Sequence, residues 1–247
     1  MQKYRYADVS RIKSNFTIIA VIALVSGFLL GSFSVQPEIK VYPASYVSES
    51  MILLPAVDDE GNGLVTPLKV EVRAGNGRIL TNIDKLLFWV DTQFSIQTAK
   101  SVAEDYTRIN TSKFDLIYTI ESSEATVIGG PSAGAALTVA TIAALQNKTL
   151  KPDVMITGTI ELDGSIGPVG GVLEKADAAR EAGAKVFVVP FGQSILSYLR
   201  PEEKCSRIGS FLNCETRYRE ITLNIEEEAG LKVVEAFNIN QAITYFL

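Results

Sequence analysis

Short stretches of alternating hydrophobic and polar residues begin the part of the chain that follows residue 50. MILLPAV (51–57), LVTPLKVEVRA (64–74) and GRILTNI (77–83) each show a pattern typical of half-buried β-strands. The Asn76-Gly77 pair joins the last two, and an Asn-Gly pair favours the tight turn of a β-hairpin. The pattern therefore predicts strands that form a hairpin around this turn.

A helical period follows from residue 91. Asp91 is a suitable N-cap, and apolar residues such as Phe94 and Val102 lie on or near one face of a helix that extends through Ile109. FDLIYTIE (114–121) is a predicted strand, and an Ala-rich run predicts a helix over 132–145.

Strands and helices alternate in the second half of the chain. The pattern predicts strands at 153–162, 185–190, 219–225 and 231–236, with helices at 172–182 and 238–246. Residues 191–217 show no regular pattern and are expected to be an irregular insertion. This order, a β-rich start followed by strand–helix alternation, predicts an α/β (α+β) domain.

The amino-terminal region has a different pattern. Phe16–Phe33 contains no charged residue in 18 positions, which as a helix would cover roughly 27 Å, close to the hydrocarbon thickness of a bilayer. We expect a cytoplasmic tail at 1–15, a transmembrane helix at 16–34, a linker at 35–50 and one domain at 51–247. Basic residues precede the apolar run (Lys3, Arg5, Arg11 and Lys13), so we expect the domain on the outer face of the cell membrane.

Two other interpretations of this apolar run remain. A cleaved signal peptide would have a shorter apolar region and a small-x-small cleavage site, and none is evident near residue 34. A buried core helix is the least favoured, because the run is apolar on all faces and lies near the start of the chain. The predicted orientation is the same whether or not the segment is cleaved.

Composition excludes several kinds of chemistry. The chain has 247 residues, a net charge of −5 and no histidine, so a Ser-His-Asp triad and a His-ligated zinc site are excluded. No nucleotide-binding P-loop and no basic stripe occur, so neither a nucleotide, metal or other cofactor nor a nucleic-acid partner is expected. Cys205 and Cys214 close a short loop, either as a disulfide or as two free thiols.

The segment GGPSAG (129–134) places Ser132 at the start of a predicted helix. A serine nucleophile needs a base, and without histidine a neutral lysine can serve. Lys175 lies near the start of the 172–182 helix among apolar residues, where burial and the helix dipole lower a lysine pKa. Taken alone, however, these patterns favour a helix-capping serine and a solvated surface lysine.

The residues around Ser132 would suit an oxyanion site. Gly130 would allow the loop to approach a substrate closely, and Pro131 suits the first turn of a helix. Ala133 adds only a small side chain next to the serine. Backbone N–H groups at this helix start lack intrahelical acceptors and can bind an oxyanion.

GPSAG, followed by TGTIELDGSIGPVGGVLEKADAAREAGAKVFVVP, resembles the proteolytic domain of Lon protease. The family carries its serine in a GPSAG-type motif and its lysine in a P-x-GG-x-x-x-K segment, which correspond to Ser132 and Lys175, 43 positions apart. The resemblance implies a Lon-protease-like domain after the apolar segment, a Ser-Lys dyad that cleaves polypeptides, and a homo-oligomeric ring. It also implies that Thr157 hydrogen-bonds the lysine.

The chain departs from the family pattern at three places. Thr159 replaces a glutamate, 191–217 is an insertion, and the ATPase module of Lon has no counterpart in these residues. We therefore expect a membrane-anchored, ATP-independent serine endopeptidase that cuts unfolded or flexible polypeptides.

Two alternatives remain. One is a scaffold or binding protein at the membrane that keeps the fold with little or no activity, which the missing glutamate leaves open. The other is a Ser-Lys hydrolase of a different fold, but its S-x-x-K motif would be Ser10–Lys13, on the wrong side of the apolar run.

Overall fold

The computed structural model describes residues 47–247 except 83–89, 121–129 and 210. The predicted tail, the predicted transmembrane helix at 16–34 and most of the predicted linker lie outside these residues. Among the helices that are described, none combines the length and the apolar composition that crossing a bilayer requires. The first strand begins at Ser48, three residues before the predicted domain start.

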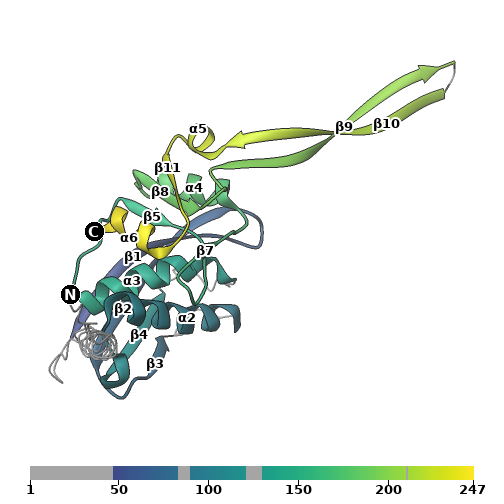
Figure 1. The fold of residues 1–247 in the computed structure, drawn as a ribbon. Helices are drawn as coiled ribbons and strands as arrows, with labels where there is room; N and C mark the ends of the chain where they lie inside the picture. The colour runs from purple at the N-terminus through teal and green to yellow at the C-terminus, as the bar shows by residue number, and fades with distance from the viewer. Residues whose placement is uncertain (1–46, 83–89, 121–129, 210) are drawn as a thin grey trace, which may run out of the picture. The chain divides into compact units, whose positions relative to one another are not determined.

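A four-stranded sheet forms the first layer of the domain (Figure 1). Its order is β1-β2-β4-β3, with β1 and β4 antiparallel to β2 and with β3 parallel to β4. The strands are β1 (Ser48–Val57), β2 (Gly63–Ala74), β3 (Ile79–Asn82) and β4 (Phe114–Ile120). Alternate residues of β2, such as Leu68 and Val70, are fully buried, as the alternation in the sequence predicts.

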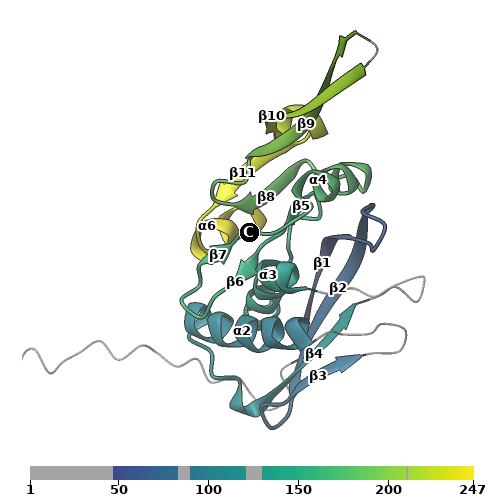
Figure 2. The same ribbon diagram turned by 90° about the vertical axis from the view of Figure 1, so that its right-hand side faces the viewer.

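One helix packs against this sheet, and a second helix packs against the first (Figure 2). The helix on the sheet is α3 (Gly134–Gln146), the helix packed on it is α2 (Val90–Thr107), and both confirm predicted helices. Residues 134–145 of α3 are all buried, and the many alanines among them allow neighbouring elements to approach closely. The buried hydroxyls of Thr138 and Thr141 donate to backbone carbonyls four residues earlier, which satisfies them inside the core.

A second sheet of three parallel strands has the order β11-β8-β5. Its strands are β5 (Val154–Ile156), β8 (Val186–Pro190) and β11 (Lys232–Ala236). The helices in this half of the domain are α4 (Val172–Glu181), α5 (Ile225–Ala229) and α6 (Ile239–Phe246). The mixed α/β class is therefore confirmed.

Shorter elements lie between these helices and strands. They are the 3₁₀ turns Thr111–Lys113 and Pro131–Ala133 and the two-stranded ladder of β6 (Thr159–Ile160) with β7 (Ile166–Gly167). The prediction of a single strand over 153–162 is wrong, because strand pairing is interrupted at residues 157 and 158, between β5 and β6. At that break, the N–H of Thr157 donates to Val188 while the N–H of Gly158 turns to Ser132.

The predicted hairpin around Asn76-Gly77 is also wrong. β2 pairs with β1 and β4, and β3 pairs only with β4. The reason is Asp115 on β4, whose carboxylate accepts hydrogen bonds from the N–H groups of Asn76 and Arg78 and from the Arg78 guanidinium. The loop folds over this carboxylate instead of closing a tight turn, and the Arg78 guanidinium holds the pKa of Asp115 at about 2.

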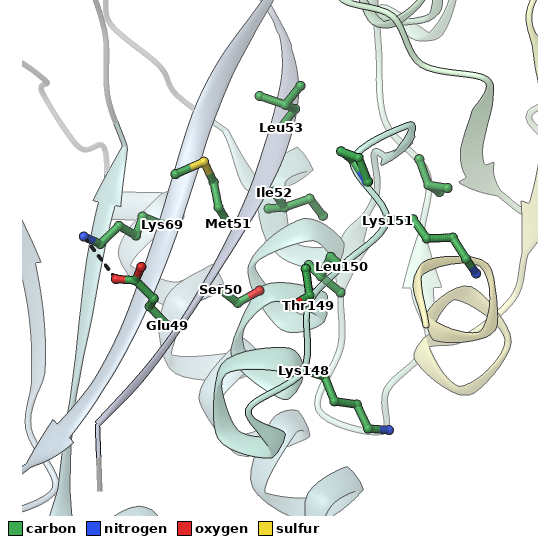
Figure 3. Close-up of a pocket in the computed structure, with 12 residues that line it drawn as sticks. Glu49, Ser50, Met51, Ile52, Leu53, Lys69, Lys148, Thr149, Leu150 and Lys151 are labelled. Atoms are coloured by element: carbon green, nitrogen blue, oxygen red, sulfur yellow. Dashed lines mark ion pairs between the residues drawn. The ribbon is translucent and has the colours of Figure 1, made fainter.

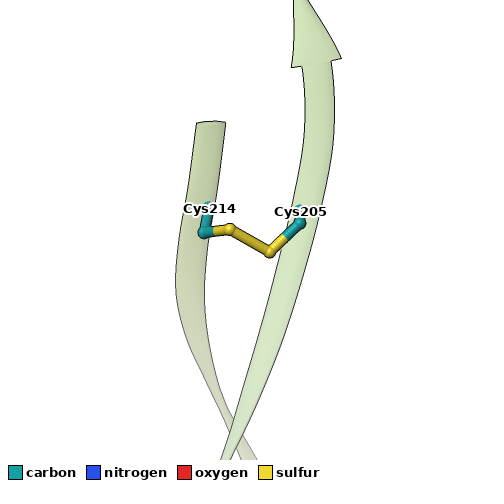
Figure 4. Close-up of a disulfide and its surroundings, with 2 residues drawn as sticks. All are labelled: Cys205 and Cys214. Atoms are coloured by element: carbon teal, nitrogen blue, oxygen red, sulfur yellow. A yellow bond between two sulfur atoms is a disulfide. The ribbon is translucent and has the colours of Figure 1, made fainter. Parts of the chain in front are cut away.

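The stretch predicted to be an irregular insertion is mostly a long β-hairpin. β9 (Ile195–Ile208) and β10 (Phe211–Asn224) pair in antiparallel register along their whole length and extend away from the two sheets (Figures 1 and 2). Cys205 and Cys214 are direct cross-strand partners and form a disulfide (Figure 4). Of the two alternatives for the cysteines, the structure therefore has the disulfide.

Candidate active site

Ser132 lies in the 3₁₀ turn Pro131–Ala133, immediately before α3. The predicted helix from residue 132 therefore begins with a tighter turn, and the α-helix itself starts at Gly134. Gly130 precedes the turn with φ of 95°, a conformation that favours glycine, and Pro131 takes the first position of the turn. Ser132 is half-buried, Ala133 is buried and Pro131 is exposed.

The break between β5 and β6 fixes the position of this turn. The carbonyl of Ser132 accepts a hydrogen bond from the N–H of Gly158 at 3.0 Å, and the N–H of Ala135 donates to the carbonyl of Gly158 at 3.0 Å. The buried hydroxyl of Thr157 also donates to the Ser132 carbonyl, at 3.4 Å. Thr157 thus contacts the backbone of Ser132, and not the amine of Lys175 as the resemblance implies.

Lys175 lies in the first turn of α4, where its N–H donates to the carbonyl of Gly171. Two glycines allow α4 to approach β1 and β2 closely. A Cβ on Gly171 would lie 2.6 Å from Val57, and a Cβ on Gly63 would lie 2.0 Å from the carbonyl of Glu174. The start of α4 is therefore held against the first sheet.

The side chain of Lys175 is 4% exposed. Its Nζ donates to the carbonyl of Gly170 at 3.0 Å. Burial lowers the pKa of this amine to about 8, and the charge of Glu174 opposes the shift. At pH 7 about a tenth of the amine is then in the neutral form, which can accept a proton, and this fraction rises with pH.

Ser132 and Lys175 line one cavity of about 200 Å³. Gly130 and Ala133 from the turn, Ile120 from β4 and Thr92 from α2 complete one side, and the end of β1 forms the rest (Leu54, Pro55, Ala56 and Val57). The structure thus brings four of the six predicted site residues to one cavity: Ser132, Lys175, Gly130 and Ala133. Among the described residues, no hydrogen bond joins the Ser132 hydroxyl to the Lys175 amine.

Sequence reasoning missed Thr92 and the β1 residues of this cavity. Thr92 drew attention only as part of a helix start, and residues 54–57 only as part of a strand. No local signal identifies them, because their place in the cavity depends on the packing of α2 and β1 around the Ser132 turn.

A larger cavity, of about 450 Å³, lies between the first half of β1 and residues 148–154 (Figure 3). Three lysines line it, but Lys69 pairs with Glu49 at 3.4 Å and Lys151 donates to the carbonyl of Tyr245. Lys148 is exposed. Because none of these amines is buried, the cavity lacks the neutral lysine that a serine nucleophile needs.

Residues 91–195 match the sequence model of the Lon protease (S16) C-terminal proteolytic domain. This match supports a Lon proteolytic domain in that part of the chain. The matched region contains Ser132, Thr157 and Lys175, and an ATPase module is not among the 247 residues.

Individual relatives agree with this assignment. The chain is 43% identical over 68 residues to a mitochondrial Lon protease homolog of Ostreococcus lucimarinus, which is 28% of this chain and 7% of that protein. It is 45% identical over 67 residues to Lon protease of Buchnera aphidicola, 27% of this chain and 9% of that protein. It is 28% identical over 153 residues to archaeal Lon protease of Thermococcus kodakarensis, 60% of this chain and 23% of that protein. The chain thus matches less than a quarter of the length of each of these relatives.

Proposed function

We propose that this chain is a serine endopeptidase in which Ser132 is the nucleophile and Lys175 is the general base. The observation that carries the proposal is the shared cavity, where a buried amine with a pKa of about 8 lies in the same small space as the serine. The Lon domain match supports the reaction class.

The reaction begins when the Ser132 Oγ attacks the carbonyl carbon of the substrate peptide bond. The hydroxyl proton passes to the neutral Lys175 Nζ as the Oγ–C bond forms. For this transfer the amine exchanges its hydrogen bond to Gly170 for one to Ser132, a change within one side chain. Catalytic hydrogen bonds commonly form only once substrate is bound.

The negative charge that develops on the substrate oxygen needs donors. We assign this role to the backbone N–H groups of Ser132 and Ala133. They lie in the first turn, where N–H groups have no acceptor within the helix. Lys175 then protonates the leaving amine as the C–N bond breaks. Water hydrolyses the acyl-enzyme to release the new carboxylate and restore Ser132.

Two hydrogen bonds to the Ser132 carbonyl have a positioning role in this proposal. The N–H of Gly158 and the hydroxyl of Thr157, both from the segment just before β6, donate to that carbonyl and so hold the backbone of the turn in place. Preorganised donors cost no reorganisation during the reaction.

We further propose that the protein is anchored in the cell membrane by residues 16–34, with the domain on the outer face. The uncharged run, its basic flank and the Cys205–Cys214 disulfide, a bond typical of oxidising compartments, support this location. Substrates would be unfolded or flexible polypeptides, cleaved without ATP, and self-association into a ring is the assembly that the resemblance implies.

Digestion of an unfolded protein tests the proposal. The full chain in detergent should cleave reduced, carboxymethylated casein, and Ser132→Ala should abolish cleavage. Lys175→Ala should lower the rate by about 10²–10⁴-fold, the usual contribution of a general base. Matched controls are Ser101→Ala and Lys185→Ala, both at exposed positions, which should keep full activity. Cleavage that persists in Ser132→Ala would overturn the assignment, and a wild type with no cleavage would favour a scaffold.

A further inference from the structure

Thr92 has a buried hydroxyl that no group in the described part of the chain satisfies. Its side chain is 2% exposed, and its Oγ1 has no hydrogen-bond partner. Other buried threonines are satisfied: Thr111 bonds Glu104, Thr138 and Thr141 bond α3 carbonyls, and Thr157 bonds Ser132. A buried hydroxyl without a partner destabilises the folded state, so Thr92 is an exception that calls for a reason.

A second buried hydroxyl in the first part of α2 does have a partner. Ser95, on the same turn of α2 and also buried, donates its hydroxyl to the carbonyl of Asp91 at 3.0 Å. Thr92 makes no such bond: it is the third residue of the helix, so no carbonyl of α2 lies four residues before it. Thr92 is instead one of the residues that line the cavity of Ser132 and Lys175.

The cavity around Thr92 is small and mostly apolar. Its volume of about 200 Å³ is below the roughly 300–1,000 Å³ of pockets that hold drug-sized ligands. The residues from β1, β4 and Ala133 offer apolar side chains, and among the described residues that line it the side-chain hydroxyls and amines belong to Thr92, Ser132 and Lys175. Since the last two are assigned to the chemistry, Thr92 is the polar group left to recognise the substrate.

We propose that Thr92 determines specificity by hydrogen-bonding a small, hydroxyl-bearing side chain of the substrate. This side chain, of serine or threonine, belongs to the residue whose carbonyl Ser132 attacks, because the cavity adjoins the nucleophile. The inference rests on the proposed peptidase function. A site built around a buried polar group rejects an isosteric apolar side chain, because binding that side chain leaves the group unpaired.

Paired peptides test this inference on the full chain in detergent. Two internally quenched peptides are identical except for Thr or Val at the residue before the cleaved bond. Wild type should cleave the Thr peptide with a kcat/KM at least tenfold higher. Thr92→Val should remove or reverse this preference, chiefly by improving cleavage of the Val peptide, while Thr92→Ser should retain it.

Controls separate this inference from the peptidase assignment and from a structural role. Thr98→Val makes the same change two turns along α2, away from the cavity, and should leave the ratio unchanged. A purely structural effect of Thr92→Val would lower both rates equally. A wild-type ratio within twofold, or an unchanged ratio in Thr92→Val, would overturn the inference even where Ser132→Ala abolishes both cleavages. If Thr92→Val does not fold, the wild-type and Thr92→Ser ratios decide.

Discussion

At the scale of single residues, Lys175 has two opposing requirements. Its amine must be buried to lose its proton near neutral pH, yet burial of an ammonium is costly without a counter-charge. Among the described residues the amine has a carbonyl partner at Gly170, and the charge of Glu174 raises its pKa. The result is a pKa of about 8 rather than the ordinary 10.5, which suits a base that must accept and then return a proton.

This pKa predicts the pH dependence of the enzyme. The active form is the neutral amine, so kcat/KM should rise with pH through about 8 and level off above it. The profile is measured with a quenched peptide between pH 6 and 10. Glu174→Gln removes the charge that raises this pKa, so the midpoint should move to lower pH. A rate that is independent of pH over this range would contradict a lysine base.

The same shift affects stability. Because the folded-state pKa lies below the unfolded value, the unfolded chain binds more protons between about pH 8 and 10.5. The free energy of unfolding contributed by Lys175 should therefore rise as pH rises through this window. Denaturant titrations at several pH values check the sign against Lys175→Met, which should lose this part of the pH dependence.

At the scale of elements, the β9–β10 hairpin is distinct from the rest of the domain. Nearly all the described side chains of β10 are exposed, so burial contributes little to its stability. Its own ladder and the Cys205–Cys214 disulfide are what hold the strands together. None of its residues lines the cavity of Ser132 and Lys175.

Removal of the disulfide should therefore loosen the hairpin without affecting catalysis. A bond that closes a short loop typically contributes about 2–4 kcal/mol. In Cys205→Ser/Cys214→Ser we expect faster amide hydrogen exchange in the outer hairpin, near 203–216, and unchanged exchange in α3 and α4. Peptide cleavage should match that of wild type. A loss of cleavage with intact exchange elsewhere would show that the hairpin takes part in substrate binding.

Some of this structure follows from sequence and some does not. Helices α2, α3 and α4 were predictable from local signals. These are the apolar period of α2, the Ala-rich run of α3 and the glycine that follows α4, Gly183. In the β9–β10 hairpin the sequence predicted a strand only at 219–225, most of which lies in β10. The rest of the hairpin was not predicted, because exposed strands carry no alternating pattern. The hairpin predicted at the Asn-Gly pair was wrong, because the loop hydrogen-bonds to a carboxylate far away in the sequence, that of Asp115.

The candidate site divides in the same way. Ser132 and Lys175 could be found from two motifs at a fixed spacing. The bond from Thr157 to the Ser132 carbonyl and the place of Thr92 in the cavity required the tertiary arrangement. Local patterns cannot show which buried hydroxyls lack a partner.

At the scale of the whole domain, the cavity depends on elements far apart in the sequence. β1, α2, β4, the Ser132 turn and α4 each contribute to its wall. The main apolar core passes beneath it and joins α3 to residues of both sheets, while a second cluster packs α4 against β8 and α5. Loss of packing in either cluster should therefore reduce activity through the geometry of the cavity.

The proposed anchor gives a prediction for the whole protein. If residues 16–34 span a bilayer, the full chain should stay with membranes after alkaline carbonate washing and be released by detergent. Replacement of Ile22 and Leu24 by arginine places charges within the apolar run and should move the protein to the soluble fraction. Release of the wild-type chain by carbonate alone would contradict the anchor.

The central claim is that Ser132 is a nucleophile activated by Lys175. Its most direct test is covalent labelling with a peptidyl fluorophosphonate, followed by peptide mapping by mass spectrometry. The account predicts one adduct, on Ser132, that forms faster as pH rises through about 8 and is lost or strongly slowed in Lys175→Ala. An adduct on another residue, or labelling of Ser132 at the same rate in Lys175→Ala, would contradict it.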